Sequence, residues 1–390
     1  MSRLDRILIS KEVGEIWENL EVIAENRRFS DHTPLVLKQV SRNYGPIPFK
    51  IFNSWLSDKE FLDCVKKAWE SFELDGNHLK MHYLMKKMKF LKSEIIKWDK
   101  NTKATRESSK RQNLKIIEEV EQKIDAGTNS EQELADREEA LTNLWNIEKQ
   151  EHENNKQIYK NRWCLEGDEN SRLFHRNINK KKRKGGIKGI MKEGVWLTDP
   201  SMVKQTFFDH FQERFKKDEE EGWVQDLSNI KKLSEVQKDA LERLFTEEEI
   251  KAAVWDCGNE KSPGPDGFNI EFIKGCWPLI KKDIIEAIQE FGSNDIIPRG
   301  CNSAFIALIP KKLDTTEVQD FRPISLVGII FKILSKTLAT RLKSILHHII
   351  NPIQSAFVQD RQILDGPLII NEILDRQKHT IRFLGNTWTR

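Results

Sequence analysis

Three side chains near the N-terminus have the types needed to act on a phosphodiester bond. Asp31 and His32 follow Ser30, and Asp5 lies in the apolar, β-branched segment Leu4 to Ile9. Such chemistry needs a group that activates the nucleophile or stabilises charge, and a carboxylate that fixes the imidazole tautomer. Asp5 and His32 fall on strands that we predict to be neighbours, so the two could meet. An ordinary turn with an Asp-capped loop explains the same residues equally well.

Five adjacent cations form a second group: Lys180, Lys181, Lys182, Arg183 and Lys184. Such a run binds phosphates without reading sequence, and the same run would serve as a nuclear-import signal. A solvated loop that binds nothing is the alternative. The formal net charge of the whole chain is only +3, so a nucleic-acid footprint must be local.

Four short segments follow one another in the second half of the chain. They are Lys261-Ser-Pro-Gly-Pro-Asp-Gly-Phe268, Ile306-Ala-Leu-Ile-Pro-Lys311, Phe321-Arg-Pro-Ile-Ser-Leu326, and Gln354-Ser-Ala-Phe-Val358 through Gln362-Ile-Leu-Asp-Gly366. The first must be a loop, because two prolines and two glycines lie within five residues. Each segment alone is compatible with an ordinary loop or strand edge, so their order is the informative feature.

In this order the segments closely resemble the fingers and early palm of the reverse transcriptase of plant LINE-type, non-LTR retrotransposons. The segment from Arg162 to His175 resembles the stretch that leads into that polymerase. Arg3-Leu-Asp-Arg-Ile-Leu-Ile-Ser10, Trp17 and Ser30-Asp-His32 resemble the C-terminal end of the apurinic-endonuclease-like nuclease of the same elements. The resemblance covers residues 1–40 and 155–374.

In the polymerase-like part, the resemblance implies roles for four residues. Lys311 and Arg322 would lie in fingers strands near the phosphates of the incoming nucleotide. Arginine suits bidentate contact with phosphate, and lysine acts as a point charge. Gln354 and Arg361 would contact the template strand, so RNA and DNA are the expected partners. The Gly/Pro loop from Ser262 to Gly267 would lie against primer or template.

In the nuclease-like part, His32 would be the catalytic histidine, Asp5 its orienting partner and Asp31 a carboxylate near the metal. The other catalytic groups of that nuclease come from upstream in the family. We therefore expect a nuclease remnant without activity, and an active metal-dependent endonuclease that uses His32 is an alternative.

The resemblance also implies Mg²⁺ as a cofactor. Polymerisation needs two metal ions about 4 Å apart, held by converging carboxylates. The family supplies one aspartate after an apolar strand downstream of Leu364-Asp-Gly366, and a pair in a Tyr/Phe-x-Asp-Asp hairpin. The sequence contains no Asp-Asp pair, and residues 375–390 do not resemble the family. We expect an incomplete metal-ligand set and a truncated, inactive polymerase.

Residues 58–159 have helical periodicity. Apolar residues from Leu84 to Ile95 recur at alternating spacings of four and three, a heptad seam. Lys86 to Lys115 holds 11 basic and 3 acidic residues, whereas Glu118 to Glu153 holds 12 acidic and 3 basic. A turn at Gly127 would lay the basic arm along the acidic arm, so we predict an antiparallel helical hairpin. Two independent solvated helices are the alternative.

Local signals predict the remaining elements. Near the N-terminus, a helix from Lys11 to Ala24 separates strands at Leu4 to Ile9 and Pro34 to Val40. The other predicted elements are a helix that starts at Asp199-Pro200, capping boxes at Ser234-x-x-Gln237 and Thr246-x-x-Glu249, a strand from Ser303 to Ile309 and a helix from Val327 to Ile350.

Together these features predict a helix-rich α+β protein in four parts. Residues 1–40 would be the C-terminal β remnant of an endonuclease/exonuclease/phosphatase-like domain, and 58–159 a helical hairpin linker. Residues 160–374 would form the fingers and early palm of a right-hand polymerase, and 375–390 an unrelated tail.

The predicted function is that of an inactive relative of an RNA-directed DNA polymerase, which at most binds RNA or DNA weakly. A non-enzymatic nucleic-acid-binding or scaffold protein is the alternative. The five scattered cysteines form no CxxC pair, which favours reduced thiols. No apolar run is long enough to span a membrane. We expect a nuclear protein or a cytoplasmic ribonucleoprotein, and not a secreted one.

Overall fold

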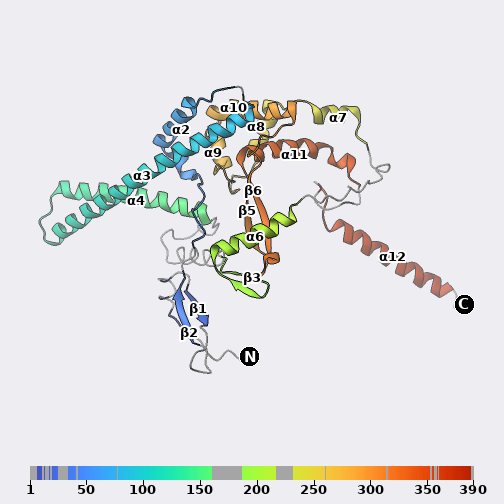
Figure 1. Ribbon diagram of the computed structural model, residues 1–390, viewed down its shortest axis with the longest axis horizontal. Coiled ribbons are helices and arrows are strands. Elements are labelled where there is room, and N and C mark those ends of the chain that lie inside the picture. The colour runs from blue at the N-terminus through green and yellow to red at the C-terminus, as the bar shows by residue number, and fades with distance from the viewer. Residues whose placement is uncertain are drawn as a thin grey trace.

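The computed structural model describes residues 7–10, 13, 17, 20–24, 34–40, 43–76, 78–159, 187–216, 232–259, 261–312, 315–351, 354, 358 and 360–387. Over these residues the chain is helix-rich, with three antiparallel sheets of two strands each. Figure 1 shows a helical body from which a long helical arm extends to one side and a single helix to the other.

Six helices share the larger hydrophobic core. They are α2 (Lys59–Ser71), the first half of α3 (Lys80–Asp125), α8 (Glu247–Asp256), α9 (Ile270–Gly275), α10 (Trp277–Asn294) and α11 (Ile329–Ile349). The short 3-10 helix η1 (Asn53–Ser57) adds the buried side chain of Trp55. This core joins residues 51–95 to residues 245–334. The predicted linker at 58–159 is therefore not separate from the segment that follows it, because its first third lies in the same core.

The heptad seam of α3 packs into this core. Leu84, Met88, Leu91 and Ile95 are buried there, where α3 contacts α2 and α10. The spacing therefore identified the buried face of α3 correctly. The partner of this face is the helical body, whereas the hairpin uses the second half of α3.

The helical arm consists of the second half of α3 and of α4 (Glu131–Tyr159), which run antiparallel (Figure 1). The chain turns back at Gly127, whose φ of +66° is accessible to glycine at little cost. Ion pairs join the arms, between Lys110 and Glu151 at 3.1 Å and between Lys123 and Glu133 at 2.5 Å. Each exposed pair contributes little to stability, because water and salt screen the attraction. The charge pattern therefore predicted the antiparallel pairing correctly.

A second, smaller core lies beside this body. Its elements are β3 (Ile190–Lys192), β4 (Val195–Leu197), α6 (Pro200–Arg214), the 3-10 helix η3 (Val318–Asp320) and part of β6 (Phe321–Val327). The Asp199 carboxylate accepts the backbone N–H groups of Ser201 and Met202, so the predicted N-cap of α6 is present. Phe207 and Phe211 are buried on the core face of α6.

The predicted N-terminal elements need correction. Leu20 to Ala24, predicted as the end of a helix, form strand β1 (Leu20–Ala24), which pairs with β2 (Leu35–Gln39). The β-branched Val22 and Ile23 lie opposite Leu37 and Val36, and this pairing outweighs the local helical pattern. Residues 7–10 are not in a strand, since β2 takes β1 as its partner.

The remaining predicted elements are present. Both capping boxes open helices, at Ser234 for α7 (Glu235–Glu242) and at Thr246 for α8. The predicted strand and long helix are β5 (Ala304–Pro310) and α11. Helix α12 (Asp365–Thr387) extends from the body (Figure 1) and runs through the predicted boundary at residue 375. Among the described residues, no helix has the length and apolar character that a membrane crossing requires.

Candidate nucleic-acid interface

Strands β5 and β6 form a hairpin that brings Lys311 and Arg322 to the same end of one face. Arg322 lies directly opposite Ile309. The backbone N–H of Lys311 donates to the carbonyl of Asp320 at 2.8 Å, which extends the pairing by one step. Opposed residues share a face, and so do residues two apart along a strand. Lys311, Ile309 and Arg322 therefore lie on one face at the outer end of the hairpin.

The cations at this end of the hairpin are exposed. Lys311 Nζ donates to the carbonyl of Gln319 at 2.6 Å, which holds its stem along the turn. Lys312 Nζ pairs with the Asp320 carboxylate at 2.8 Å, and this hydrogen bond raises the pKa of the Lys312 ammonium. The Arg322 side chain is exposed on the strand.

The other face of the hairpin is anchored to the smaller core. The Phe321 and Phe207 rings lie perpendicular, with centroids 5.1 Å apart, and Leu308 packs against the same cluster. The face that carries Arg322 therefore points away from this core and also exposes apolar groups. An aromatic and two aliphatic side chains are exposed there, Phe305 at 41%, Ile309 at 43% and Ile324 at 46%. Such a surface can contact phosphates through its cations and bases through its apolar groups.

The Gly/Pro loop at Lys261 to Phe268 has a structural role that the sequence did not reveal. The Asp266 carboxylate accepts the backbone N–H of Ile329 at 2.5 Å and of Phe268 at 3.4 Å. It therefore caps the N-terminus of α11, where the helix dipole favours a negative charge. Burial raises the pKa of Asp266, and these backbone hydrogen bonds oppose that rise. The loop thus fixes where β6 ends and α11 begins.

Gln354 and Arg361 are brought together in the structure. One terminal nitrogen of Arg361, Nη1, donates to the carbonyls of Asn351 and Gln354, each at 2.7 Å. The guanidinium thus fixes the turn that precedes α12. Contact of these two residues with a template strand stays a prediction.

The remaining predicted site residues lie outside the described residues. They are Asp5, Asp31 and His32 of the nuclease-like part, and Lys180, Lys181, Lys182, Arg183 and Lys184 of the basic run. Within the described ranges, no group of three or more His, Cys, Asp or Glu side chains could hold a metal ion. The Mg²⁺ that the resemblance implies stays a prediction.

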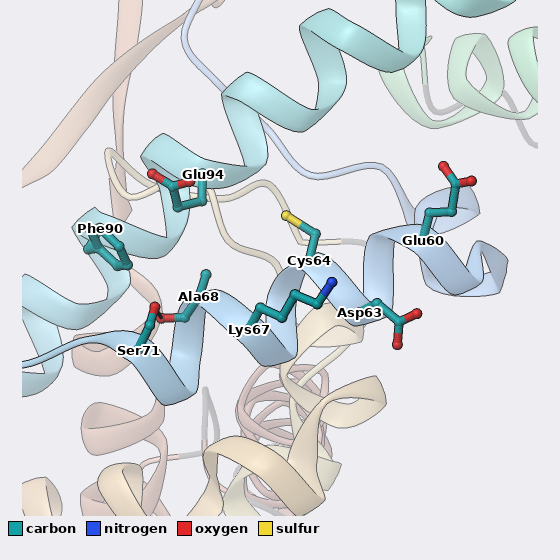
Figure 2. Close-up of a pocket in the computed structure, with 8 residues that line it drawn as sticks. All are labelled: Glu60, Asp63, Cys64, Lys67, Ala68, Ser71, Phe90 and Glu94. Carbon is teal, nitrogen blue, oxygen red and sulfur yellow. Dashed lines mark hydrogen bonds between the residues drawn. The ribbon is translucent and has the colours of Figure 1, made fainter.

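A pocket of about 490 Å³ opens between α2 and α3 (Figure 2). Phe90 and Glu94 of α3 face α2 across it, and Cys64 is its one thiol. Burial, and next the nearby Glu94 carboxylate, raise the pKa of the Cys64 thiol, which makes it a poor nucleophile. The other lining residues are Glu60, Asp63, Lys67, Ala68 and Ser71. Their mixed charges give the pocket no preference for an anion such as nucleic acid.

Two curated proteins are similar in sequence to the chain. The "Transposon TX1 uncharacterized 149 kDa protein" of Xenopus laevis is 27% identical over 395 residues, which covers 97% of this chain and 29% of that protein. The "Retrovirus-related Pol polyprotein from type-2 retrotransposable element R2DM" of Drosophila melanogaster is 30% identical over 143 residues, 36% of this chain and 13% of the polyprotein. The homologues are non-LTR retrotransposon proteins. No protein-family model matches the chain.

These retrotransposon relatives extend the resemblance read from the motifs. The motifs covered residues 1–40 and 155–374, whereas the alignment with the TX1 protein covers 97% of the chain. The aligned region therefore includes the helical arm as well. The chain spans less than a third of the length of either relative.

Proposed function

We propose that this chain is a nucleic-acid-binding segment of a LINE-type retrotransposon polyprotein of the plant kind, at the front of its reverse transcriptase. The β5–β6 hairpin would belong to the fingers, and α11 and α12 to the fingers and early palm. The similarity to the R2DM Pol polyprotein supports this proposal, as does the order of the four segments. Its site of action would be the nucleus or a cytoplasmic ribonucleoprotein.

The observation that carries the proposal is the outer end of the β5–β6 hairpin. Lys311 and Arg322 lie there on one exposed face, and Phe305 and Ile324 extend this face with exposed apolar groups. Cations contribute affinity for phosphates without regard to sequence, and an aromatic ring adds stacking with any base. The partner of this surface would be a template or primer strand, or the phosphates of a nucleotide.

Replacing Arg322 and Lys311 by alanine should weaken binding of single-stranded RNA several-fold. Each lost phosphate contact should also reduce the magnitude of the slope of log affinity against log salt by about 0.7. Fluorescence anisotropy of a labelled oligonucleotide, measured at several salt concentrations, gives both quantities. Arg322→Lys should restore part of the affinity, because it keeps the charge but not the bidentate geometry.

Lys103→Ala is a control for the loss of an exposed cation elsewhere on the chain. It removes one exposed cation that pairs with Asp99 at 2.6 Å on α3. The control should bind RNA as the wild-type chain does. An unchanged affinity of the Lys311→Ala/Arg322→Ala variant, with its fold intact by circular dichroism, would contradict the proposed role of the hairpin.

As an isolated chain, the protein should make no cDNA. A reverse-transcriptase centre needs converging carboxylates for two metal ions, and the sequence contains no Asp-Asp pair. Extension of a labelled DNA primer on an RNA template, with Mg²⁺ and all four deoxynucleotides, tests this expectation. Primer-extension activity that co-purifies with the chain would overturn the proposal that the isolated chain is inactive.

A further inference from the structure

Helix α11 carries a row of lysines on one face. Lys332, Lys336 and Lys343 fall within an arc of about 40° at 100° per residue. The helix contains no Asp or Glu. The exposed Ala339 lies on the same face between Lys336 and Lys343. A rigid, extended polyanion could therefore lie close along this face.

A fourth lysine lies near this row, and the carboxylates of Asp256 and Asp266 lie near its lysines. Asp256, at the end of α8, forms an ion pair with Lys336 at 2.5 Å, and its side chain is 70% exposed. The hydrogen bond from Lys336, and next the charges of Lys336, Lys343 and Lys261, lower the pKa of Asp256. Around Asp256, at the C-terminal end of α8, lysines therefore outnumber the carboxylate.

The loop that carries Lys261 is held by side chains from two helices. Lys332 Nζ donates to the carbonyl of Ser262 at 3.1 Å. Lys274 Nζ of α9 donates to the carbonyl of Cys257 at 3.2 Å, on the other side of Lys261. These bonds fix the position of Lys261 relative to α11. The fold therefore holds the charge of Lys261 in a defined position beside α11.

We propose that the lysine surface, defined as Lys261, Lys332, Lys336 and Lys343, binds the phosphodiester backbone of nucleic acid. The proposal rests on the proposed function and adds a second contact to the one at the β5–β6 hairpin. Lys336 and Lys343 are about 10 Å apart along the helix axis. Phosphates of one strand rise by about 3.4 Å each, so the row matches about three of them.

Contacts of this kind fix the path of a strand and carry no sequence information. The surface offers ammonium groups and no aromatic side chain among its four members, so bases are not expected to contribute. Strand β6 runs into α11 through Gly328. The two proposed contacts are therefore joined by a short, regular part of the chain.

The test uses the full chain with Lys336→Gln and Lys343→Gln together. The probes are labelled single-stranded RNA, single-stranded DNA and duplex DNA, each of two unrelated sequences. On single strands, the magnitude of the salt slope should decrease by about 1.4, the value for two phosphates, and affinity should fall several-fold. The loss should be equal for both sequences. The three probes show whether RNA or DNA is preferred.

The matched control is Lys281→Gln with Lys282→Gln on α10. These lysines also pair with carboxylates, Lys281 with Glu247 at 3.5 Å and Lys282 with Glu286 at 3.9 Å. The control removes the same charge from another helix and should leave the slope unchanged. An equal loss in control and test variants would overturn the lysine surface as a specific site.

The outcomes separate this inference from the proposed function. A wild-type chain that binds no probe contradicts both. Binding that depends on Arg322 but keeps its slope without Lys336 and Lys343 contradicts the lysine surface alone. Should the double variant fail to fold, Lys343→Glu alone provides the test, because Lys343 is exposed near the end of α11. That variant should weaken binding, and an unchanged slope would again overturn the inference.

Discussion

Replacing Arg341 by alanine should lower the free energy of unfolding by about 3–5 kcal/mol. The Arg341 side chain is buried and lies over the Phe245 ring, 4.1 Å from its centroid. Its guanidinium donates to Glu249 Oε2 at 2.8 Å and to the carbonyls of Leu241 at 3.0 Å and Leu244 at 2.8 Å. Truncation leaves these acceptors without their donor, and the unpaired groups account for most of the cost. Urea unfolding followed by circular dichroism measures it.

Arg243→Ala provides the control, because Arg243 binds the same carboxylate from the surface. Its side chain is 59% exposed, and Nη2 lies 2.9 Å from Glu249 Oε1. The expected loss is less than about 1 kcal/mol, as for other exposed ion pairs. Equal losses for the two variants would show that the buried position of Arg341 has no special importance.

The pair of Arg341 and Glu249 should also make the stability of the fold depend on pH in the acidic range. The hydrogen bond from Arg341 lowers the pKa of Glu249 from 4.5 to about 2. A carboxyl with a lowered pKa stabilises the fold fully above pH 4.5, and this contribution is lost as the pH falls toward 2. Wild-type stability should therefore fall more steeply than that of Arg341→Ala over this range. Parallel pH profiles for the two proteins would contradict this explanation.

Replacing Gly264 by alanine should destabilise the junction between β6 and α11 by about 1–3 kcal/mol. A Cβ atom on Gly264 would lie 2.4 Å from the backbone carbon and oxygen of Val327 and 2.6 Å from the nitrogen of Gly328. These are backbone atoms at the start of α11, so they cannot turn away as a side chain can. The loop or the helix must shift, and the Asp266 cap would weaken. The urea midpoint of unfolding should therefore decrease.

Gly258→Ala is the control for this variant. Its Cβ would meet only the flexible side chain of Lys261, at 3.8 Å from Cε. The expected change is less than about 0.5 kcal/mol, as for most surface substitutions. A Gly264→Ala protein as stable as the Gly258→Ala protein would show that the loop packs less closely than described.

Local hydrogen bonds were readable from the sequence, whereas distant ones were not. The capping boxes at Ser234 and Thr246 involve partners three residues away, so a short motif specifies them. Asp266 caps α11 across 63 residues, and Arg341 reaches Glu249 across 92. Neither pairing has a local signal, because it depends on how the helices pack.

The partner of an element was also harder to predict than the element itself. The heptad seam from Leu84 to Ile95 predicted a buried helical face, but an apolar stripe does not say which helix covers it. The residues of strand β1 were predicted to be the end of a helix. They form a strand because their pairing with β2, which the local pattern does not show, decides their conformation. The row at Lys332, Lys336 and Lys343 was not predicted, although its spacing and the absence of acidic residues in 329–349 are properties of the sequence. That this row lies near Lys261 and Asp256 could be learned only from the fold.

Equilibrium binding of the wild-type chain to single-stranded RNA at increasing salt tests the central claim most directly. We predict binding at about 50 mM salt, and a linear fall of log affinity with log salt. Between three and five phosphate contacts, spread over the hairpin and the lysine surface, would give a slope of about −2 to −3.5. No binding at low salt, or an affinity independent of salt, would contradict the account.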